Sequence, residues 1–432
     1  MVKFYFCFLL VISLFSCHCH GGNTNEVNKG IPFAEDTISF NVFGELFNKE
    51  VEIIHDVDLQ GKKCVIPEDV LLIFKGGIVK NGTLEGRMTK IQYSGACFHR
   101  VRITGTWDVS NISSTMFDDL SYDNALKDVV ALSNPKVKNE IRIAKGKYQV
   151  TALEGEEKCL SFNSCTDVIF DGEIILTPNN LVGYSIFYAE GENIRISGRG
   201  LIAGDKHSHT GKEGEWGMGV RLYNAVNTSV KGLTIKDCWG DCIYIGGKSR
   251  NIEINKCVLE HGRRQGISVT QAVDVTIKNC MITKVGGTAP QYAIDIEPNK
   301  HCAVNNVLIE GVEVKDCKGG FLVTRGKKYA RTAIGKVQIK KCNVSVEGRY
   351  PIRVKNCESL LIDGCILYGS NIKPGIEVEG VSKANVTNNS IYIKEKLLPS
   401  IRNVSKVMEQ YSAINITNCG QKKVTGNHIY KR

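Results

Sequence analysis

Two stretches near the middle of the chain carry a pattern that predicts its architecture: Trp239-Gly240-Asp241-Cys242-Ile243-Tyr244-Ile245-Gly246 and Arg263-Arg264-Gln265-Gly266-Ile267-Ser268-Val269. Each contains two apolar residues that flank a residue of another kind, and the two motifs lie 24 residues apart. The apolar pair recurs through the second half of the sequence, at Val220/Leu222, Ile243/Ile245, Ile267/Val269, Ile294/Ile296, Phe321/Val323, Ile352/Val354, Ile376/Val378 and Ile414/Ile416.

A second pattern runs beside the first, in which two apolar residues are followed three positions later by a cysteine. Its members end at Cys238, Cys257, Cys280, Cys317, Cys342 and Cys365, and two later members end at Asn389 and Asn427. A fixed period of roughly 20–40 residues is typical of a solenoid, because one repeat cannot bury its apolar face alone. The strands alternate with period 2 and no helical pattern lies between them, so the sequence predicts an all-β solenoid, a parallel β-helix.

The residue between each apolar pair is predicted to point outward, because successive side chains of a strand face opposite sides. This gives an outward ladder of Arg221, Tyr244, Ser268, Asp295, Leu322, Arg353, Glu377 and Asn415. The interior of a β-helix is filled with packed side chains. Any binding or chemistry therefore has to come from this ladder and from the turns beside it.

The cysteines are predicted to be free thiols. The chain has 17 of them, but six occupy equivalent sites in successive coils, where cysteine serves as a small buried apolar residue. No CxxC pair suggests a structural zinc site. A ladder of inward thiols is therefore favoured over a disulfide framework.

The charge of the chain bears on its partners. A formal net charge of +10 over 432 residues favours an anionic partner such as an acidic polysaccharide, or simply keeps the protein soluble. No basic run with interleaved aromatic residues is present, so nucleic acid is not an expected partner.

Residues 1–17 are interpreted as a lipoprotein-type signal peptide. Lys3 precedes an apolar run that is too short to span a membrane. Leu14-Phe15-Ser16-Cys17 resembles a bacterial lipobox. This predicts export to the periplasm or the outer-membrane surface of a Gram-negative bacterium, with membrane attachment only through a lipid anchor at Cys17; plain secretion is the alternative. Residues 18–30 are polar, and residues 18–35 are predicted to be a tether.

The remaining chain is divided by changes of pattern. Residues 36–115 hold short strands rich in turn residues and are predicted to form an N-terminal β-rich region. Residues 118–135 change to a helical period, which predicts a short N-terminal helix capping the open end of the solenoid. Residues 116–432 form the β-helix, with a loop or short helix inserted at 393–410. A long polar interruption at 203–217 is predicted to be a binding loop, since long loops on rigid scaffolds often carry function.

The quoted motifs, together with Ile294-Asp295-Ile296-Glu297-Pro298-Asn299, resemble the coils of pectate-lyase-like right-handed parallel β-helix proteins. Residues 118–148 resemble the entry to the helix in proteins related to glycoside hydrolase family 28, and residues 66–110 resemble the N-terminal region of exported Bacteroidetes members. The resemblance implies a single-stranded right-handed parallel β-helix and a carbohydrate-active enzyme. Two positions depart from family 28 polygalacturonases: Gly240-Asp241 stands where they carry paired aspartates, and Arg264-Gln265-Gly266 where they carry Gly-His-Gly.

Three carboxylates are the candidate catalytic residues. Asp295 and Glu297 lie at i and i+2 on one strand, so both face outward, and such neighbours shift each other's pKa as an acid and base pair requires. Asp241 precedes its strand at a turn, two coils away from Asp295. The alternative for Asp241 is a turn aspartate that binds its own backbone, and the alternative for Asp295 and Glu297 is a solvated acidic face.

Eight residues are the candidate substrate-binding residues. Arg263 and Arg264 could bind a uronate or a sulfate, and Gln265 could bind a sugar hydroxyl. Trp216 and Trp239, and more weakly Tyr244, could stack on the apolar face of a sugar; Tyr292, which is outside the set of eight, is an equally weak candidate. Glu215 and Arg221 complete the predicted set. Exposed basic turns and turn-packing aromatic residues are the alternatives.

No metal site and no cofactor is predicted. The loop holds His207 and His209 with Asp205, Glu213 and Glu215, but an HxH pair in a loop is a weak signal for a metal. His261 is a candidate general base, although histidines are common in turns.

Three functions remain open. The leading hypothesis is an exported glycoside hydrolase that cleaves a polysaccharide or oligosaccharide with a pair of carboxylates. The second is a polysaccharide lyase that acts on uronates by β-elimination, where Ca²⁺ or Arg264 would neutralise the uronate carboxylate. The third is a non-catalytic glycan-binding surface protein.

Overall fold

The computed structural model describes residues 36–44, 46–325, 333–369, 373–393 and 413–431. Residues Pro32–Arg432 form one compact unit. The predicted signal peptide at 1–17, the tether at 18–35 and nearly all of the late insertion at 393–410 lie outside the described residues, so these remain predictions.

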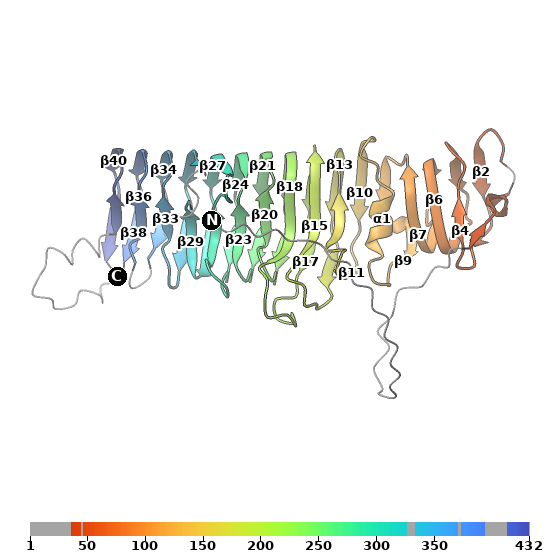
Figure 1. The fold of residues 1–432 in the computed structure, drawn as a ribbon, viewed down its shortest axis with the longest axis horizontal. Helices are drawn as coiled ribbons and strands as arrows, with labels where there is room; N and C mark the ends of the chain where they lie inside the picture. The colour runs from red at the N-terminus through yellow and green to blue at the C-terminus, as the bar shows by residue number, and fades with distance from the viewer. Residues whose placement is uncertain (1–35, 45, 326–332, 370–372, 394–412, 432) are drawn as a thin grey trace, which may run out of the picture. The chain divides into compact units, whose positions relative to one another are not determined.

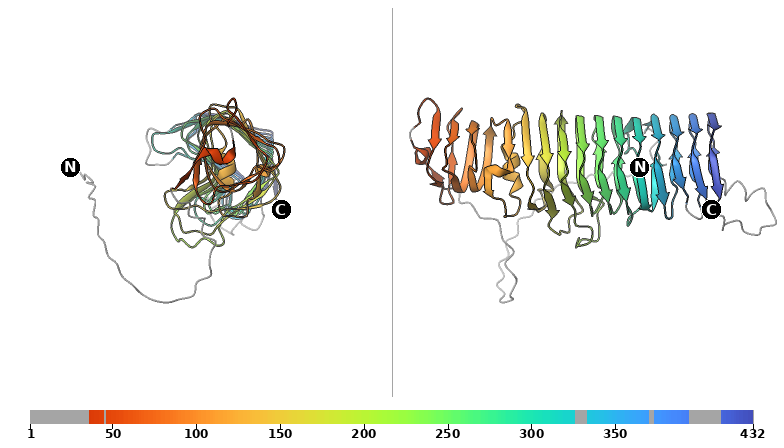
Figure 2. Two further views of the ribbon diagram at one scale, coloured as in Figure 1. Left: turned by 90° about the vertical axis from the view of Figure 1, so that its right-hand side faces the viewer. Right: turned by 180° about the vertical axis from the view of Figure 1, so that it is seen from behind.

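Parallel strands stack coil upon coil in chain order, as Figure 1 shows. Each coil contributes to three columns of strands, and β18 (Trp216–Lys231) is long enough to serve both the first and the second. The first column also contains β12 (Lys158–Phe162), β15 (Gly183–Glu192), β20 (Ile243–Gly246), β23 (Gln265–Val269), β26 (Tyr292–Ile296), β29 (Gly319–Val323), β33 (Ile352–Lys355), β36 (Ile376–Glu379) and β39 (Ile414–Thr417). Seen from the end, the coils overlie one another around a common interior (Figure 2).

The second column follows the first in each coil. It contains β10 (Asn139–Ile143), β13 (Thr166–Phe170), β16 (Arg195–Gly198), β21 (Ser249–Asn255), β24 (Ala272–Lys278), β27 (Ala303–Glu310), β30 (Ala333–Ile334), β31 (Lys336–Lys340), β34 (Ser359–Asp363), β37 (Lys383–Thr387) and β40 (Gln421–Thr425).

The third column is an 11-stranded parallel sheet. It contains β11 (Lys147–Val150), β14 (Glu173–Leu176), β17 (Leu201–Ala203), β19 (Thr234–Lys236), β22 (Val258–Glu260), β25 (Met281–Thr283), β28 (Glu313–Cys317), β32 (Asn343–Val346), β35 (Ile366–Tyr368), β38 (Ser390–Ile393) and β41 (His428–Lys431). The bend that leads into this column passes through one residue with positive φ in each coil, where Gly and Asn are the least strained choices: Gly232, Lys256, Asn279, Gly311, Lys341, Gly364, Asn388 and Gly426.

The outward ladder has the predicted register. Pairing along the first column joins Arg221, Tyr244, Ser268, Asp295, Leu322, Arg353, Glu377 and Asn415 in that order. The apolar neighbours of these residues face inward, and Val220, Ile243, Ile267 and Ile294 are fully buried. The parallel β-helix predicted from the sequence is confirmed.

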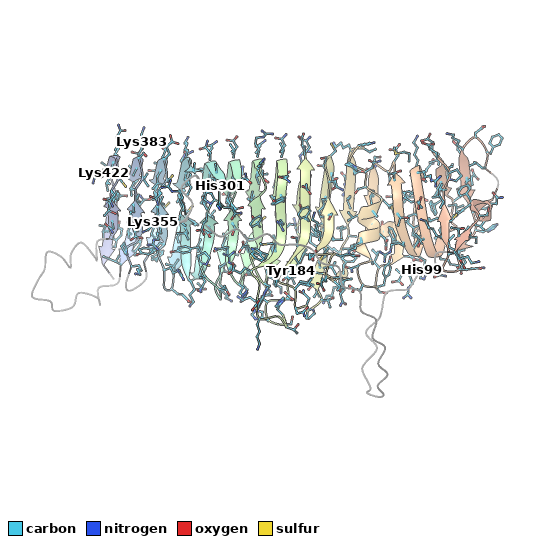
Figure 3. All side chains as sticks on the ribbon, in the orientation of Figure 1. His99, Tyr184, His301, Lys355, Lys383 and Lys422 are labelled. Atoms are coloured by element: carbon cyan, nitrogen blue, oxygen red, sulfur yellow. The ribbon has the colours of Figure 1, made fainter. Side chains whose placement is uncertain are left out.

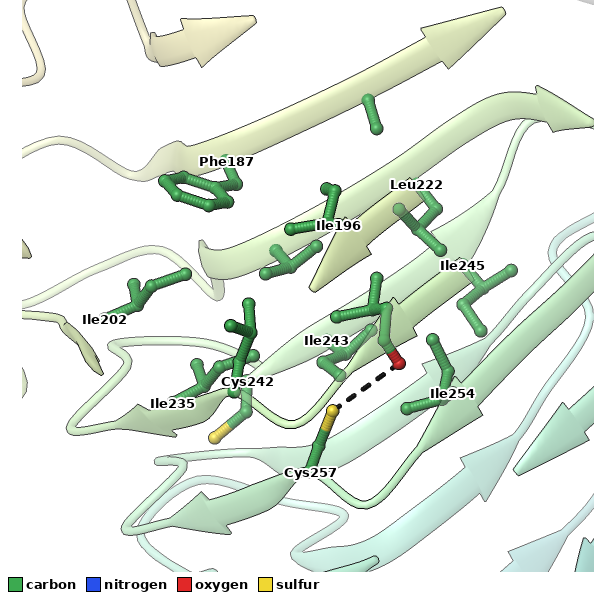
Figure 4. Packing of buried hydrophobic residues seen from close by; sticks show 14 of the residues in the cluster. Phe187, Ile196, Ile202, Leu222, Ile235, Cys242, Ile243, Ile245, Ile254 and Cys257 are labelled. Carbon is green, nitrogen blue, oxygen red and sulfur yellow. Dashed lines mark hydrogen bonds between the residues drawn. The ribbon is translucent and has the colours of Figure 1, made fainter. Parts of the chain in front are cut away.

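The cysteine ladder is confirmed in part. The 14 cysteines in the described ranges are free, and the six predicted ladder members are all buried. Four of them, Cys257, Cys280, Cys342 and Cys365, follow strands of the second column, and their thiols contact backbone carbonyl oxygens. Figure 4 shows Cys257 packed among isoleucines in this way.

The assignment of Cys238 and Cys317 to the same column was wrong. Cys238 follows β19 and Cys317 ends β28, so both belong to the third column. Leu233 and Val312 take their places in the second column, because their carbonyl oxygens accept from the residues after Cys257 and Cys342. Both columns repeat two apolar residues followed by a small buried one, so the sequence pattern could not separate them.

The N-terminal residues also form parallel strands. They comprise β1 (Thr37–Ile38), β2 (Glu50–Ile53), β3 (Val57–Asp58), β4 (Lys63–Val65), β5 (Leu71–Phe74), β6 (Val79–Gln92), β7 (Phe98–Trp107), β8 (Asn111–Ser113) and β9 (Phe117–Asp119), with 3-10 helices η1 (Phe40–Phe43) and η2 (Ser114–Met116). Of these, β8 pairs with β10 and so joins the second column.

The predicted helix at 118–135 corresponds to the short helix α1 (Leu126–Ala131). It packs against β7 on one side and β12 on the other. Because strands lie on both sides of α1, its predicted role as a cap on an open end is not confirmed. None of the helices among the described residues has the length and apolar character needed to cross a membrane.

Candidate functional site

A cleft of about 310 Å³ opens over the outward ladder. The ladder residues Tyr244, Ser268 and Asp295 form its floor, and residues of the preceding turns and of the 203–217 loop form its walls. The full lining is Glu215, Trp216, Asp241, Tyr244, Arg264, Ser268, Thr270, Asp295, Glu297, Pro298 and Asn299. A larger cavity of about 590 Å³ lies beside α1, but its lining holds no comparable group of carboxyls.

Two buried carboxyl groups flank strand β23. Asp241, in the turn before β20, is 1% exposed, and Asp295, on β26, is 4% exposed. Ser268 Oγ donates to Asp241 Oδ2 over 2.7 Å, and Gln265 Nε2 donates to Asp295 Oδ2 over 2.8 Å. Both donors lie on β23, the strand between the two carboxyls, so one strand fixes an oxygen of each.

The other oxygen of each carboxyl group has no hydrogen-bond partner within the described parts of the chain. Asp241 Oδ1 and Asp295 Oδ1 are both buried and unpaired. Gln265 is itself held in place, because its Oε1 accepts from the backbone N–H of Tyr292 over 2.9 Å. The site therefore holds two fixed carboxyl groups, each with one oxygen that no described protein group binds.

Burial sets the protonation of these groups. Loss of solvent raises the pKa of Asp241 to about 6, while Arg264 and the Ser268 hydroxyl act in the opposite direction. Burial raises the pKa of Asp295 well above its usual range, and the charges of Glu297 and Asp241 add to the shift. Burial also raises the pKa of Glu297, against the effect of Arg264. The three carboxyls thus share fewer than three negative charges near neutral pH.

Arg264 is the cation of the cleft. Its Nε lies 3.3 Å from Glu215 Oε2 and also donates to the carbonyl oxygen of Ala289 over 3.3 Å. Its charge lowers the pKa of Asp241, Asp295 and Glu297. The side chain remains 20% exposed, so it can also reach a bound ligand.

A buried aspartate anchors the loop between β17 and β18. Asp205 accepts from Tyr184 Oη over 2.5 Å and from Asn179 Nδ2 over 3.0 Å, and it pairs with His209 Nδ1 over 2.8 Å. Figure 3 shows Tyr184 where the loop side chains crowd against the coils. Since Asp205 is 2% exposed, this group fixes the base of the loop that carries Glu215 and Trp216.

Trp239 and Arg263 contact the same loop, and neither residue lines the cleft. The Trp239 ring stacks on His209 with centroids 4.0 Å apart. Arg263 lies 3.6 Å over the Trp239 ring, donates to the Trp239 carbonyl oxygen over 2.7 Å and also donates to that of Gly214. The structure thus places these two predicted substrate-binding residues behind the loop.

A second groove of about 400 Å³ continues from the cleft and shares Trp216 and Tyr244 with it. Arg221 and Lys158 line this groove. The Arg221 guanidinium lies among the rings of Tyr188, Tyr223 and Tyr244 at 4.8 to 5.9 Å. Its buried Nε has no hydrogen-bond partner within the described residues.

Most of the predicted site residues are therefore brought together. The cleft contains all three predicted catalytic carboxylates and the predicted binding residues Glu215, Trp216, Tyr244 and Arg264. Arg221 lies in the adjoining groove, and Gln265 lies beneath Asp295. Tyr292 is buried.

The sequence analysis missed the role of Ser268, the donor to Asp241, although it placed Ser268 in the outward ladder beside Tyr244 and Asp295. It also missed Thr270, whose hydroxyl donates to Tyr244 Oη over 2.7 Å. Ser268 is in register with Asp295, and Thr270 follows the position in register with Ile296, next to Glu297. These acidic neighbours could have indicated that both hydroxyls belong to the site.

The loop residues considered for a metal are not brought together as a set. Asp205 and His209 are committed to the buried group, and their side chains are fully covered. His207 instead faces Asp237 and His261, which come from two successive coils, and the ligand atoms of these three side chains lie within 4.8 Å of one another.

Comparison with known sequences gives a family. A family model described as "Right handed beta helix region" matches residues 177–333 and 329–432. The SPbeta prophage-derived uncharacterized protein YorA of Bacillus subtilis is 28% identical over 288 residues, which is 59% of this chain and 47% of that protein. The chain spans about half the length, or less, of the curated relatives it matches.

One solved structure shows a similar fold, and a second is reported beside it. The mannuronan C-5 epimerase AlgE6 A-module of Azotobacter vinelandii has a TM-score of 0.51 at 13% identity, over 72% of this chain and 96% of that one. The family 28 exopolygalacturonase of Yersinia enterocolitica has a TM-score of 0.46 at 10% identity, over 76% of this chain and 79% of that one. At 13% identity the likeness to the epimerase module concerns the fold alone.

Proposed function

This chain belongs to the right-handed β-helix family, and from that premise we propose that it is a glycoside hydrolase acting on a polysaccharide or oligosaccharide in the cleft over β23. The observation that carries the proposal is the pair of buried carboxyl groups on either side of β23, each with one oxygen fixed and the other free. Glycosidases use such a pair on the two sides of the scissile bond.

The two pKa shifts suggest the division of roles. Asp295, whose pKa is raised well above its usual range, would hold a proton and donate it from Oδ1 to the leaving glycosidic oxygen. Asp241, with a pKa of about 6, would be ionised at neutral pH and would take a proton from the attacking water through Oδ1. Glu297 would help Asp295 to hold its proton, because its charge adds to the effect of burial in raising the pKa of that carboxyl.

We propose inversion at the anomeric carbon, because a whole coil, that of β23, separates the two carboxyl groups. Their backbones lie two strand spacings apart, roughly 9.6 Å along the stack, and Asp295 is also offset along its strand, in register with Tyr244 and not with Asp241. Carboxyl groups about 6.5–9.5 Å apart leave room for a water on the face opposite the leaving group. We therefore expect the first-formed sugar to carry the inverted anomeric configuration, which proton NMR during early turnover reads directly.

The surrounding residues would bind the sugar units. Trp216 is 55% exposed at the boundary between the cleft and the adjoining groove, where its ring offers a stacking surface. In that groove Arg221 has an unpaired Nε and Lys158 is exposed, which suits a carboxylate or sulfate on the next sugar unit. The proposed substrate is therefore an acidic glycan.

The cellular setting belongs to the same proposal. The lipobox-like Leu14-Phe15-Ser16-Cys17 supports export and a lipid anchor at Cys17, and an extracellular glycan would be encountered there. Labelling with a radioactive fatty acid in a Gram-negative host, lost in a Cys17→Ala variant, tests the anchor.

The test of activity uses the purified chain and a panel of acidic and neutral polysaccharides, with reducing ends and ultraviolet absorbance followed together. Hydrolysis releases reducing ends without absorbance. Asp241→Asn and Asp295→Asn should each reduce the rate by roughly 10²–10⁴-fold, while Asp274→Asn, at an exposed aspartate on β24, should leave it unchanged.

Two outcomes would replace the proposal. Absorbance rising with reducing ends would mean β-elimination, in which Arg264 would neutralise a uronate carboxylate. Binding without turnover, with affinity preserved in Asp241→Asn, would mean a glycan-binding protein.

A further inference from the structure

We propose that His207, Asp237 and His261 bind one divalent transition-metal ion, with Zn²⁺ as the best match, and that this ion ties the 203–217 loop to the coils beneath it. The site is independent of the proposed hydrolase function. The chemistry of the cleft does not use any of its three residues.

The coil repeat brings two of the ligands together. Asp237 follows β19 and His261 follows β22, at the same place in successive coils 24 residues apart. Both adopt the left-handed backbone conformation, with φ of 55° and 57°. Backbone bonds hold both turns, since Asp237 N–H donates to the Glu260 carbonyl oxygen over 3.1 Å and His261 N–H to that of Thr283 over 3.0 Å. Two ligands thus stand on a rigid base.

The loop supplies the third ligand. His207 Nε2 lies 3.2 Å from Asp237 Oδ1, and its ring centroid lies 5.9 Å from that of His261. The N–H of Lys206 donates to the Asp237 carbonyl oxygen over 2.8 Å, so the backbone beside His207 is attached to the same turn. One ligand atom from each of the three residues lies within 4.8 Å of the others. The His207 side chain is exposed, and its rotation would bring all three atoms to the distance of a shared metal ion.

The donor set selects the kind of ion. Two imidazoles and one carboxylate suit Zn²⁺ and its transition-metal neighbours, whereas Ca²⁺ and Mg²⁺ prefer oxygen ligands alone.

The position of the site suggests what the ion would do. His207 lies near the start of the loop, and Glu215 and Trp216 lie at its end over the cleft. The turns that hold Asp237 and His261 continue to Asp241 and Gln265, four residues further along each coil. A bound ion would therefore join the loop to the two turns that support the cleft.

The experiment measures Zn²⁺ binding by calorimetry to the full chain after dialysis against a chelator. Cys17, His18, Cys19 and His20 near the N-terminus are competing ligands, so all four are changed to Ser in every chain tested. One Zn²⁺ per chain is expected. His261→Ala and His207→Ala should each weaken binding by at least about tenfold, since even outer-shell changes weaken metal sites by 10–100-fold. His301→Ala should not, although His301 (Figure 3) has a similar φ of 62°.

Two further readouts separate this site from other zinc binding. Co²⁺ in the same chain should give a spectrum of nitrogen and oxygen ligation without thiolate bands, because buried cysteines take no part. Lys212 is exposed in the 203–217 loop, which a bound ion would hold in place. Zn²⁺ should therefore slow tryptic cleavage after Lys212 in the chain with Ser at positions 17–20, but not when that chain also carries His207→Ala. Equal Zn²⁺ affinity in the starting chain, Asp237→Asn and His261→Ala, or no binding at all, would overturn the proposal. His207→Ala changes only an exposed loop side chain, so loss of folding would not obscure the result.

Discussion

Asp241 links the chemistry of the cleft to the stability of the fold. Burial raises its pKa from about 3.8 to about 6, so the folded chain holds this proton more tightly than the unfolded chain does. The resulting stabilisation is fully present below about pH 3.8 and is lost as the pH rises through about 6. Above that pH the folded state bears the whole penalty of a buried charge, on the order of 3 kcal/mol.

Replacing Asp241 by Asn should therefore raise the melting temperature at about pH 7.5 and change it much less at about pH 4. Under the proposed hydrolase function this gain should accompany loss of activity, because catalytic carboxyls are commonly kept at the expense of stability. Thermal melts at the two pH values measure it. Asp274→Asn, at an exposed position, should show no such pH dependence, and an equal shift at both pH values for Asp241→Asn would contradict the account.

Ser268 should control the acid limb of the activity profile. Its hydroxyl lowers the pKa of Asp241 by donating to the charged carboxylate. In Ser268→Ala that pKa should rise, and the base form should appear only at higher pH. The acid limb of kcat/KM against pH should move upward, while Ser268→Thr, which keeps the hydroxyl, should restore it. An unmoved limb in Ser268→Ala would mean that Asp241 is not the base.

The 203–217 loop forms one wall of the cleft. Gly240, in the turn before β20, sets how closely this loop approaches that turn. A Cβ at Gly240 would lie 2.4 Å from the Glu215 carbonyl oxygen and 3.0 Å from the Gly217 nitrogen. Both contacts are with backbone, so the loop would have to move.

Gly240→Ala should displace Glu215 and Trp216 and lower kcat/KM by about 10²-fold, the usual effect of a misplacement of about 1 Å. The melting temperature should fall only slightly. Gly95→Ala is the matched control, because nothing lies within 4 Å of a Cβ there. Kinetics on the two variants, with tryptophan fluorescence to follow Trp216, make the comparison. Wild-type kcat/KM in Gly240→Ala would show that loop position is unimportant.

The element scale also shows why part of the site could not be read from the sequence. Tyr244, Ser268 and Asp295 could be assigned to one ladder, because the apolar pair that flanks each of them recurs once in every coil. Trp239 and Arg263 were expected to face a sugar, yet Arg263 binds the carbonyl oxygens of Trp239 and Gly214. Every residue has a backbone carbonyl oxygen, so the sequence does not show which of them a side chain will bind. The path of a long loop is also not repeated from coil to coil, so it cannot be predicted from the period. The alignment of Asp237 with His261 could be predicted from the repeat, whereas the approach of His207 could not.

At the scale of the whole molecule, the parallel stack should be stable without covalent cross-links. The 14 cysteines of the described ranges are free, and burial raises the pKa of several of them, for example that of Cys317 to about 12. A reducing agent should therefore leave the melting temperature unchanged, and thiol reagents should react fully only after unfolding. A lower melting temperature under reduction would reveal disulfides.

The architecture was the most predictable part, because the same inward and outward alternation is repeated coil after coil and each repeat supports the next. The sequence was less informative where two columns of strands have the same pattern and where a segment departs from the strand period. Cys238 and Cys317 were assigned to the wrong column because two columns share one pattern. The helix at 118–135 was predicted to cap an open end because its period differs from that of the strands, and this role is not confirmed.

The carboxyl pair and its two donors occupy only three successive coils, with β23 in the middle. Duplication of a coil outside that trio would lengthen the surface along which the proposed glycan would lie and leave the pair unchanged. Duplication within it would separate Asp241 from Asp295 by a further strand spacing of about 4.8 Å, too far for a single bond cleavage. A lineage built on this scaffold can therefore vary the length and charge of the ligand it accommodates by adding or losing outer coils, while selection holds the central trio at constant length.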